Sequence, residues 1–212
     1  MLRNFEQVKT MQNQEIVTAL DDEIQRLLNR RRDFQPAFDA FDADDLALYA
    51  RYNQAYHDAV FMRKAFADAM GSHCVSNQVG AIAVRNGVSI LSGVNGTPPG
   101  TINCDQRFKQ YNPLTDREEH RAWSKLHEIH AEMNLINSSS RFGIPLAGTT
   151  VYCTHQLCSE CFKNYLSLGL ERVVICKGYD KAGITIDEER ARANEVGMQF
   201  HTLSEILTNV AY

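Results

Sequence analysis

The chain has 212 residues, of which 44% are hydrophobic and 23% charged, and its formal net charge is −4. This composition is that of a folded globular protein with one sizeable core, and it excludes a disordered chain. No apolar run is long enough to cross a bilayer and the opening residues are too polar for a secretory signal, so we expect a cytoplasmic protein without a membrane partner. The negative charge argues against a protein that wraps nucleic acid, but a small anionic substrate stays open.

The first 33 residues are predicted to form one amphipathic helix. Apolar residues recur there at three- and four-residue steps, which places them on one side of a helix. The arginines at 30–32 follow the last apolar residue, where the helix dipole favours cations. A phosphate-binding patch is the alternative interpretation of these arginines.

A Pro- and Asp-rich stretch ends this pattern and introduces a second predicted helix. Asp44 or Asp45 can cap its first turn, and apolar residues then continue at helical spacing until Gly71 stops the helix. An interruption near Asn53 is the alternative. The chain is therefore expected to be mostly helical before its first strand.

A β-hairpin is predicted next. Residues 79–84 form a short apolar run, Asn86-Gly87 is the strongest two-residue turn signal, and residues 88–92 supply the returning strand. Residues 93–103 are too rich in Gly and Pro for regular structure, so we expect a loop of defined shape.

Helices and strands alternate through the rest of the chain. A charged segment over 117–125 leads into a helix that carries His130 and Glu132. This alternation predicts a central sheet with helices on its faces, an α/β fold. The expected strands are 149–154, 172–176 and 198–203, and the other expected helices are 158–168 and 187–195.

The residues with the clearest chemistry are an H-x-E at His130 and Glu132 and a C-x-x-C at Cys158 and Cys161. One imidazole and two thiolates hold zinc and leave the fourth coordination position for water, while the carboxylate is free for proton transfer. Alone, the C-x-x-C is equally half of a structural zinc site or a redox pair. Together, in this order, the two motifs indicate a hydrolytic zinc centre.

Helix geometry restricts where this centre can form. Residues two apart in a helix do not share a face, so His130 and Glu132 converge on one metal only where their helix begins. If Cys158 and Cys161 also lie in a first helical turn, free N–H groups and two positive dipole ends surround the metal. That environment lowers the thiol pKa and favours ionised ligands.

Three segments carry a resemblance to a known family, namely residues 126–136, 150–161 and 93–96. They are similar to the deoxycytidylate (dCMP) deaminases of the cytidine deaminase superfamily, and most similar to the T-even bacteriophage type. The resemblance divides the chain into a helical N-terminal extension, 1–55, and a zinc-dependent nucleotide deaminase domain, 56–212.

The resemblance implies a three-layer α/β/α sandwich with a central mixed sheet. It also implies hydrolytic deamination of dCMP to dUMP and ammonia, which supplies dUMP for thymidylate synthesis. The resemblance further implies that the protein assembles as a homo-oligomer, usually a hexamer. A phage-encoded enzyme of this family is expected in the cytoplasm of the host.

Carried over by position, the catalytic zinc falls on His130, Cys158 and Cys161, and the proton shuttle falls on Glu132. Nucleotide contacts are expected from the loop over 93–103, from the helix that carries His130 and from Lys181, which follows a predicted strand. The alternative interpretation of Lys181 is an exposed loop lysine without a role in binding. These substrate candidates are Asn95, Thr97, Ala131 and Lys181.

The stretch Gly93-Val94-Asn95-Gly96 also resembles the family's allosteric motif, which serves activation by dCTP and inhibition by dTTP, often with Mg²⁺. Arg141 falls where the phage enzyme has an arginine tied to this regulation, but Ser138 stands where that enzyme carries phenylalanine. A solvated arginine at the end of a helix is the alternative for Arg141.

A second, structural zinc is implied by the same resemblance. Two thiolates, one imidazole and one carboxylate fill all four coordination positions, as a structural zinc requires. His127 is the alternative fourth ligand and His73 a weaker one, and buried thiols without metal are the plain interpretation of the cysteines. The expected ligands are Cys74, Cys104, His120 and Glu128.

Two features depart from the family. Leu157 replaces the proline that precedes the first cysteine of the C-x-x-C and pre-sets the helix start. Residues 1–55 have no counterpart in the phage enzyme; we expect them to cover a domain surface or a subunit interface, with a lid over the nucleotide pocket as the second hypothesis.

Rival functions are a dCTP or dual dCMP/dCTP deaminase and, less favoured, a polynucleotide cytosine deaminase.

Overall fold

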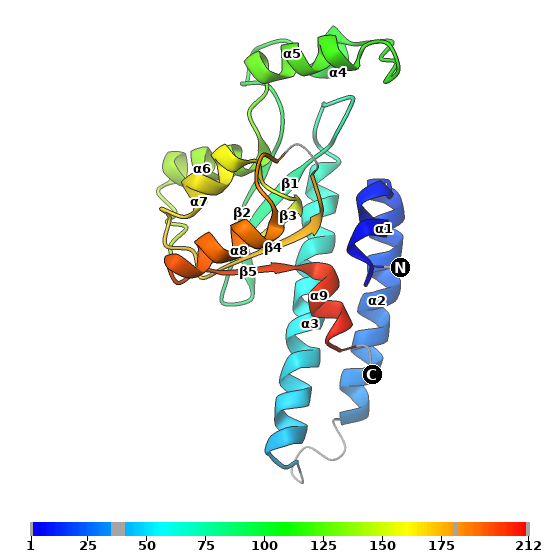
Figure 1. Ribbon diagram of the computed structural model, residues 1–212, viewed down its shortest axis with the longest axis vertical. Helices are drawn as coiled ribbons and strands as arrows, with labels where there is room; N and C mark the ends of the chain where they lie inside the picture. The colour runs from blue at the N-terminus through cyan, green and yellow to red at the C-terminus, as the bar shows by residue number, and fades with distance from the viewer. Residues whose placement is uncertain (1, 35–40, 180–181, 211–212) are drawn as a thin grey trace.

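The computed structural model describes residues 2–34, 41–179 and 182–210. Five strands form one mixed sheet in the order β2-β1-β3-β4-β5, in which β1 is antiparallel to both neighbours and β3, β4 and β5 run parallel (Figure 1). The predicted hairpin is present, with Asn86 and Gly87 both at positive φ in its turn. The strands are β1 (Gly80–Arg85), β2 (Val88–Val94), β3 (Thr150–His155), β4 (Arg172–Lys177) and β5 (Gln199–Thr202).

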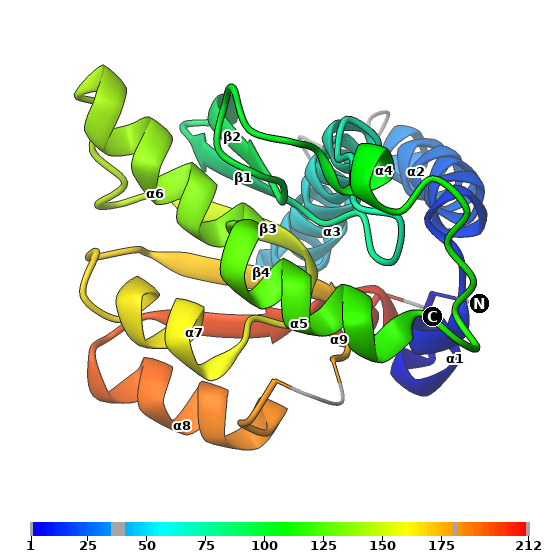
Figure 2. The same ribbon diagram turned by 90° about the horizontal axis from the view of Figure 1, so that it is seen from above.

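Helices cover both faces of this sheet (Figures 1 and 2). Within the described residues the helices are α1 (Phe5–Thr10), α2 (Asn13–Phe34), α3 (Ala43–Ala69), α4 (Cys104–Arg107), α5 (Arg117–His127), α6 (Ala131–Phe142), α7 (Ser159–Tyr165), α8 (Ile186–Glu195) and α9 (Leu203–Thr208). None of them is long and apolar enough to cross a membrane.

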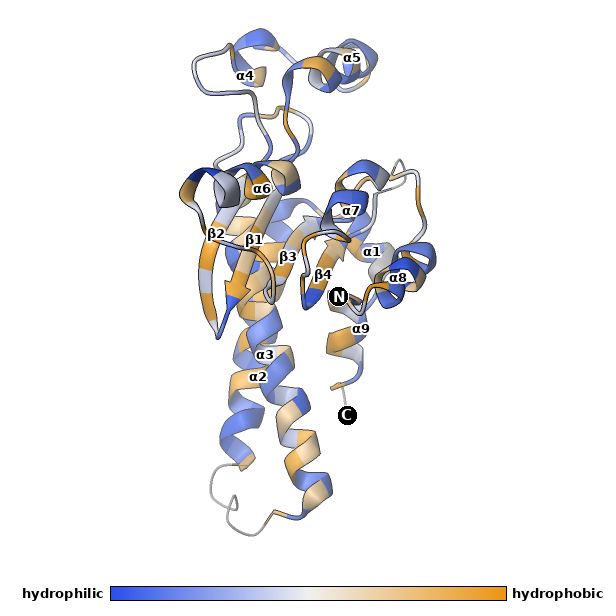
Figure 3. Ribbon diagram, turned by 90° about the vertical axis from the view of Figure 1, so that its left-hand side faces the viewer, coloured by the Kyte–Doolittle hydropathy of each residue, from blue (hydrophilic) through white to orange (hydrophobic). Residues whose placement is uncertain are grey.

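Side chains alternate along the central strands and thereby build two cores. Ile82 and Val174 belong to the core shared with α1, α2, α3 and α9, whereas Ala81 and Val173 belong to the core shared with α6, α7 and α8. Figure 3 shows the central strands as largely hydrophobic, as strands buried on both faces must be. The predicted three-layer α/β/α sandwich is confirmed.

The N-terminal helices differ from the prediction in detail. The single helix expected over 1–33 is wrong, because the chain leaves helical conformation at Met11 and Gln12 and the carboxylate of Glu15 accepts from the Gln12 N–H at 2.7 Å to begin α2. Helix α3 is capped by Asp42, and the expected caps Asp44 and Asp45 instead donate their backbone N–H groups to it.

Helix α3 runs without the interruption considered near Asn53, as the prediction of one helix up to Gly71 requires. Two other helical features were not expected. The charged segment after 117 is a separate helix, α5, and does not continue into the helix of His130. Helices α4 and α9 have 4 and 6 residues, which is too short for a periodic apolar pattern to reveal.

A buried ion pair fixes α3 to the sheet. Asp58, which is fully buried on α3, accepts two hydrogen bonds from Arg172 at the start of β4, at 2.7 and 2.8 Å. The hydroxyl of Tyr152 on β3 donates to the same carboxylate at 2.7 Å. With the 3.0 Å hydrogen bond from Nε2 of Gln54, four hydrogen bonds to this carboxylate compensate the removal of Asp58 from water, and those from Arg172 and Tyr152 set the position of α3.

We predict that Asp58→Ala lowers the free energy of unfolding by about 3–5 kcal/mol, because it leaves the guanidinium of Arg172 poorly solvated and unpaired. Asp58→Leu combined with Arg172→Leu should recover most of this loss, since neither charge then stays behind. The measurement is urea unfolding of the metal-loaded protein. The control is Asp21→Ala, which removes the exposed ion pair with Arg63 and should cost at most about 1 kcal/mol. Equal losses in the two single variants would contradict the assignment.

Candidate active site and metal centres

The candidate site lies along one edge of the sheet. In the strand register Gly80 pairs with Val94, Ala81 with Cys153 and His155 with Lys177, so the start of β1 and the ends of β2, β3 and β4 share this edge. The segments that follow these strand ends carry Asn95, Cys158 and Tyr179, and all three residues line one cavity.

The three predicted ligands of the catalytic zinc meet at this edge. His130 immediately precedes α6 and Cys158 immediately precedes α7, each as an N-cap residue with extended backbone, and Cys161 lies in the first turn of α7. The Sγ atoms of Cys158 and Cys161 are each 3.4 Å from Nδ1 of His130. Ligands around a tetrahedral zinc are separated by about 3.5 Å, given the usual bond lengths, so this donor set fits zinc.

The electrostatics of this group favour an ionised thiol. Hydrogen bonds from the thiol of Cys161 and the ring of His130 lower the pKa of Cys158 well below its usual value. The same contact with Cys158 raises the pKa of His130. The first turns of α6 and α7 also direct free N–H groups toward the ligands, which stabilises negative charge.

Glu132 lies in the first turn of α6, beside the ligand group. Its side chain lines the cavity but is 4% exposed, and burial raises its pKa to about 7, with His130 acting in the opposite direction. A carboxyl group with a pKa near neutrality exchanges a proton readily in either direction. The arrangement is therefore suited to general acid/base chemistry.

The second predicted ligand set is also assembled. Atoms of Cys74, Cys104, His120 and Glu128 lie within 4.8 Å of one another. Nε2 of His120 is 3.2 Å from Sγ of Cys104 and 3.7 Å from Sγ of Cys74, again the separation expected of ligands to one zinc.

Two observations show that these four residues fit a cation. Oε1 of Glu128 is buried with no hydrogen-bond partner, although its other oxygen accepts from Ser124. Burial raises the pKa of Cys74, and that of Cys104 to about 12, so the thiols ionise only with a positive charge beside them. A metal supplies that charge and the missing partner of Glu128.

The alternative ligands of the second group lie elsewhere. His127 is exposed and stacks on Trp123, with ring centroids 4.8 Å apart. His73 pairs with Asp105 at 2.8 Å. The structure therefore brings Glu128, and neither of these histidines, to Cys74, Cys104 and His120.

The remaining candidates are distributed unevenly. Asn95 and Ala131 line the cavity, whereas Thr97 is not among the cavity residues and donates to Oδ1 of Asn103 at 3.1 Å. Arg141 is exposed at the end of α6 with its guanidinium over the ring of Phe142. Lys181 lies outside the described residues.

Asn95 and Gly93 have evident structural tasks. The side chain of Asn95 accepts from the N–H of Val79 at 2.8 Å and donates to the carbonyl of Asn77 at 2.9 Å, so it holds the loop before β1. Gly93 packs directly on the backbone of α6, where a Cβ would collide with the carbonyl of Ala131. Gly96 forms a backbone bridge with Ile129, which ties the loop to the start of α6.

The family profile described as "Cytidine and deoxycytidylate deaminase zinc-binding region" matches residues 55–177. The chain belongs to this family. It is accordingly a zinc-dependent hydrolase of the dCMP deaminase type, as the sequence predicted.

Individual relatives agree with this assignment. The deoxycytidylate deaminases of Enterobacteria phages T2 and T4 are 33% and 34% identical, and each match covers 55% of this chain and 78% or 76% of the relative. The ComE operon protein 2 of Bacillus subtilis is 31% identical over 60% of this chain and 68% of its own length. The structure of the cyanophage S-TIM5 dCMP deaminase in complex with dCMP and dUMP is 26% identical, covers 68% of this chain and 93% of that one, and has a TM-score of 0.52.

The departure at Leu157 leaves the deaminase ligand set in place. Leu157 is fully buried in the core of α6, α7 and α8. Cys158 still has the extended backbone of an N-cap, with φ −73° and ψ 159°. Burial of the leucine side chain therefore replaces the rigid ring of proline in fixing the chain before α7.

The segment from residue 9 to the first residue of α2, Asn13, contacts two loops beside the cavity. Nζ of Lys177 donates to the carbonyl of Met11 at 2.7 Å, and the stem of Lys9 covers Gly178, next to the cavity residue Tyr179. Nδ2 of Asn13 donates at 2.9 Å to the carbonyl of Gln78, in the loop before β1. The segment from 9 to 13 thus contacts both loops that border the site.

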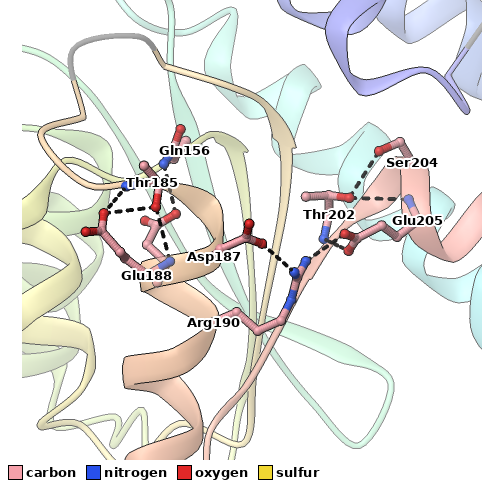
Figure 4. Close-up of polar contacts among 9 residues, drawn as sticks. Gln156, Thr185, Asp187, Glu188, Arg190, Thr202, Ser204 and Glu205 are labelled. Atoms are coloured by element: carbon pink, nitrogen blue, oxygen red, sulfur yellow. Dashed lines mark hydrogen bonds and ion pairs between the residues drawn. The ribbon is translucent and has the colours of Figure 1, made fainter.

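Sequence reasoning did not identify Gln156 and Glu189. Gln156 lines the cavity, and the oxygen of its side-chain amide accepts a hydrogen bond from the backbone N–H of Tyr179. The nitrogen of the same amide donates to the carbonyl of Ile184 and to the carboxylate of Glu189, both at 3.0 Å. Figure 4 shows Gln156 beside the first turn of α8, near Thr185 and Glu188. Gln156 and Glu189 are 33 positions apart in the sequence, so no local pattern connects them.

Glu189 is a fully buried carboxyl group behind this cavity wall. Burial raises its pKa to about 8, while the hydrogen bond from Gln156 opposes the shift. Its other oxygen has no partner among the described residues. At neutral pH the folded protein therefore holds Glu189 mostly protonated.

We predict that Glu189→Gln stabilises the protein at high pH. A carboxyl group whose folded pKa is about 8 keeps its proton on folding below that pH, whereas the unfolded group ionises near 4.5, so stability falls as pH rises between these values. Glutamine has no charge to bury. Urea unfolding at pH 9 should show the variant more stable by a few kcal/mol, on the order of 1.4 kcal/mol per pKa unit, with a much smaller difference at pH 5.

The control is Glu195→Gln, which changes an exposed carboxylate at the end of α8. Its effect on stability should not change between pH 6 and pH 9. A pH-independent effect of Glu189→Gln would show that Glu189 is ionised in the folded protein and would contradict the prediction.

Proposed function

We propose that the protein catalyses the hydrolytic deamination of dCMP to dUMP and ammonia. The observation that carries the proposal is the juxtaposition of Glu132 with the His130/Cys158/Cys161 group in one cavity. Further support comes from the phage relatives, whose names are deoxycytidylate deaminase, and from the cyanophage enzyme that was solved with dCMP and dUMP.

His130, Cys158 and Cys161 would hold the catalytic zinc, which activates a water molecule when bound. Glu132 would take up the protons of the attacking water and deliver one to N3 of cytosine and one to the amino group, so that the C4–O bond forms, the C4–N bond breaks and ammonia leaves. A pKa of about 7 suits both roles, because the same group must accept and donate near neutral pH.

The chain's other residues shape this reaction. Ala131 and Asn95 line the cavity and are the candidate contacts to the nucleotide, and Asn95 also keeps the loop before β1 in position. Gln156 lines the cavity and is held by Glu189 and Tyr179. These contacts fix the walls before substrate arrives, which lowers the cost of orienting it.

Cys74, Cys104, His120 and Glu128 would hold a second, structural zinc. With four protein ligands this site has no position for water, so its task is to fix the segments that carry its ligands.

The finer expectations from the family are also kept as proposals. We propose that residues 56–212 form the deaminase domain and that residues 1–55 form a helical extension, although α3 crosses this boundary. Thr97 and Lys181 stay candidate nucleotide contacts. Regulation by dCTP and dTTP with Mg²⁺ would involve Gly93, Asn95, Gly96 and Arg141, and a hexamer stays the expected oligomer.

We predict that Glu132→Ala lowers the rate of ammonia release by about 10²- to 10⁴-fold, because the proton shuttle is lost while the ligand group stays intact. The assay compares dCMP, dCTP, deoxycytidine and a cytosine-containing oligonucleotide. The highest kcat/KM with dCMP would support the proposal. A higher kcat/KM with dCTP or with the oligonucleotide would show that dCMP is not the preferred substrate. The matched control is Glu160→Ala, an exposed carboxylate between the two cysteines, which should keep activity within a few-fold. Full activity in Glu132→Ala would overturn the mechanism.

We predict two zinc ions per chain in protein purified without chelator. Cys104→Ser should lower the content to one and reduce the melting temperature, because a ligand with lower zinc affinity replaces the thiolate. Cys176→Ser is the control, since this buried cysteine belongs to neither group and both ions should be retained. A single zinc per chain in the parent protein would exclude the structural site.

A further inference from the structure

Helix α5 presents one strip of side chains to the cavity. The cavity residues from this helix and its C-cap follow the spacing i, i+3, i+4, i+7 and i+11, which is one face of a helix. They are Arg117, His120, Arg121, Ser124 and Glu128. In Figure 2, which views the molecule from above, α5 crosses in front of the sheet strands.

The two arginines of this strip have no ion-pair partner within the described part of the chain. Carboxylates are close in sequence, but Glu119 pairs with Arg107, and Asp116 accepts from Thr115 and Asn112. By contrast, Arg63, Arg172 and Arg190 each pair with a carboxylate. Arg117 and Arg121 therefore offer free guanidinium groups at the cavity.

Their placement is unfavourable for α5 alone. Arg117 is the first residue of the helix, where the dipole disfavours cations, and Arg121 follows it at i+4, where like charges repel. An anion between the two guanidinium groups would reverse both effects. The two arginines therefore do not contribute to the stability of the helix by themselves.

Charge in the cavity is divided. Among the described residues, the basic side chains of Lys and Arg type that line the cavity are those of Arg117 and Arg121. The carboxylates that line it are Glu128, in the second ligand group, and Glu132, beside His130. The exposed side chains of Ser76 and Asn77 also line it and can donate hydrogen bonds. A ligand with a neutral ring at His130 and an anionic group at α5 would match this distribution.

We propose that Arg117 and Arg121 form the subsite for the 5′-phosphate of the pyrimidine deoxynucleotide, an inference that rests on the proposed deamination. A phosphate monoester carries close to two negative charges at neutral pH, which two guanidinium groups neutralise. The planar fork of arginine bonds two phosphate oxygens at once, whereas lysine offers only a point charge.

The second ligand group holds this subsite in place. His120 lies between the two arginines in sequence, and it joins α5 to Cys104 on α4 and to Cys74 before β1. Figure 1 shows α4 and α5 standing away from the layered body. Only a small apolar cluster surrounds the group, formed by Cys74, Cys104 and Phe108 with Val75, Tyr111 and Trp123. The position of the arginines therefore depends on this metal group.

The test is the kcat/KM of zinc-loaded parent, Arg117→Gln, Arg121→Gln and the double variant with dCMP and with deoxycytidine, together with the affinity for dUMP measured by calorimetry. A charge-assisted hydrogen bond contributes enough for about a 10- to 100-fold effect per arginine. We expect the double variant to lose at least about 100-fold with dCMP and in dUMP affinity, and less than about 3-fold with deoxycytidine. Arg121→Lys should recover part of the loss.

Lys125→Gln is the matched control, because Lys125 is an exposed cation on α5 that does not line the cavity, and its kinetics should equal those of the parent. Zinc content and circular dichroism establish that each variant is folded. Unchanged dUMP affinity and dCMP kinetics in the folded double variant would overturn the phosphate subsite while leaving the deamination intact. A zinc-loaded parent that releases no ammonia from any cytosine substrate would instead overturn the proposed function, and the subsite with it.

Discussion

The site depends on the convergence of two helix N-termini at one edge of the sheet. His130 and Cys158 are both N-cap residues with extended backbone, so their side chains precede the helices and point to the same place. Moving either helix start by one residue would rotate its ligand by about 100°. The β1–β3 and β3–β4 registers hold these starts in place, and the Asp58–Arg172 pair holds α3 against the opposite face of the sheet.

The second ligand group solves a different physical problem. The segment from α4 to α5 has few apolar side chains of its own, and several that it has are exposed, including Leu114 and Leu126. A segment that cannot bury enough surface needs another source of order, and a metal with four protein ligands would supply one. The same segment forms a wall of the cavity, so local stability and the shape of the site are linked through His120 and Glu128.

Local patterns in the sequence predicted the layers of the fold and the His130/Cys158/Cys161 ligand set, whereas the second ligand set followed from the resemblance to the dCMP deaminases, because its members are too far apart in sequence to form a motif. Alternation of helices and strands indicated the layers, and the spacing of His130 and Glu132 required a helix start, which the structure contains. Details that depend on competition between neighbours were harder: several aspartates could cap α3, and Asp42 does so. Gln156 and Glu189 could not be found at all, because neither belongs to a motif and only the folded chain brings them together. The same holds for Arg117 and Arg121, whose cavity-facing position depends on how α5 is attached.

The contacts of the segment from 9 to 13 also constrain how the protein comes to its final shape. The carbonyl of Met11 and the ammonium of Lys177 are separated by 166 positions, and the hydroxyl of Thr208 reaches the carbonyl of Arg3, 205 positions away. A ribosome makes the early helices long before their partners on β4 and α9 exist, so those helices wait with an apolar face uncovered. Contacts between such distant residues are slow to form because of the entropy of closing the loop. The segment from 9 to 13 can therefore contact both loops beside the cavity, the one before β1 and the one after β4, only after β4 has been synthesised.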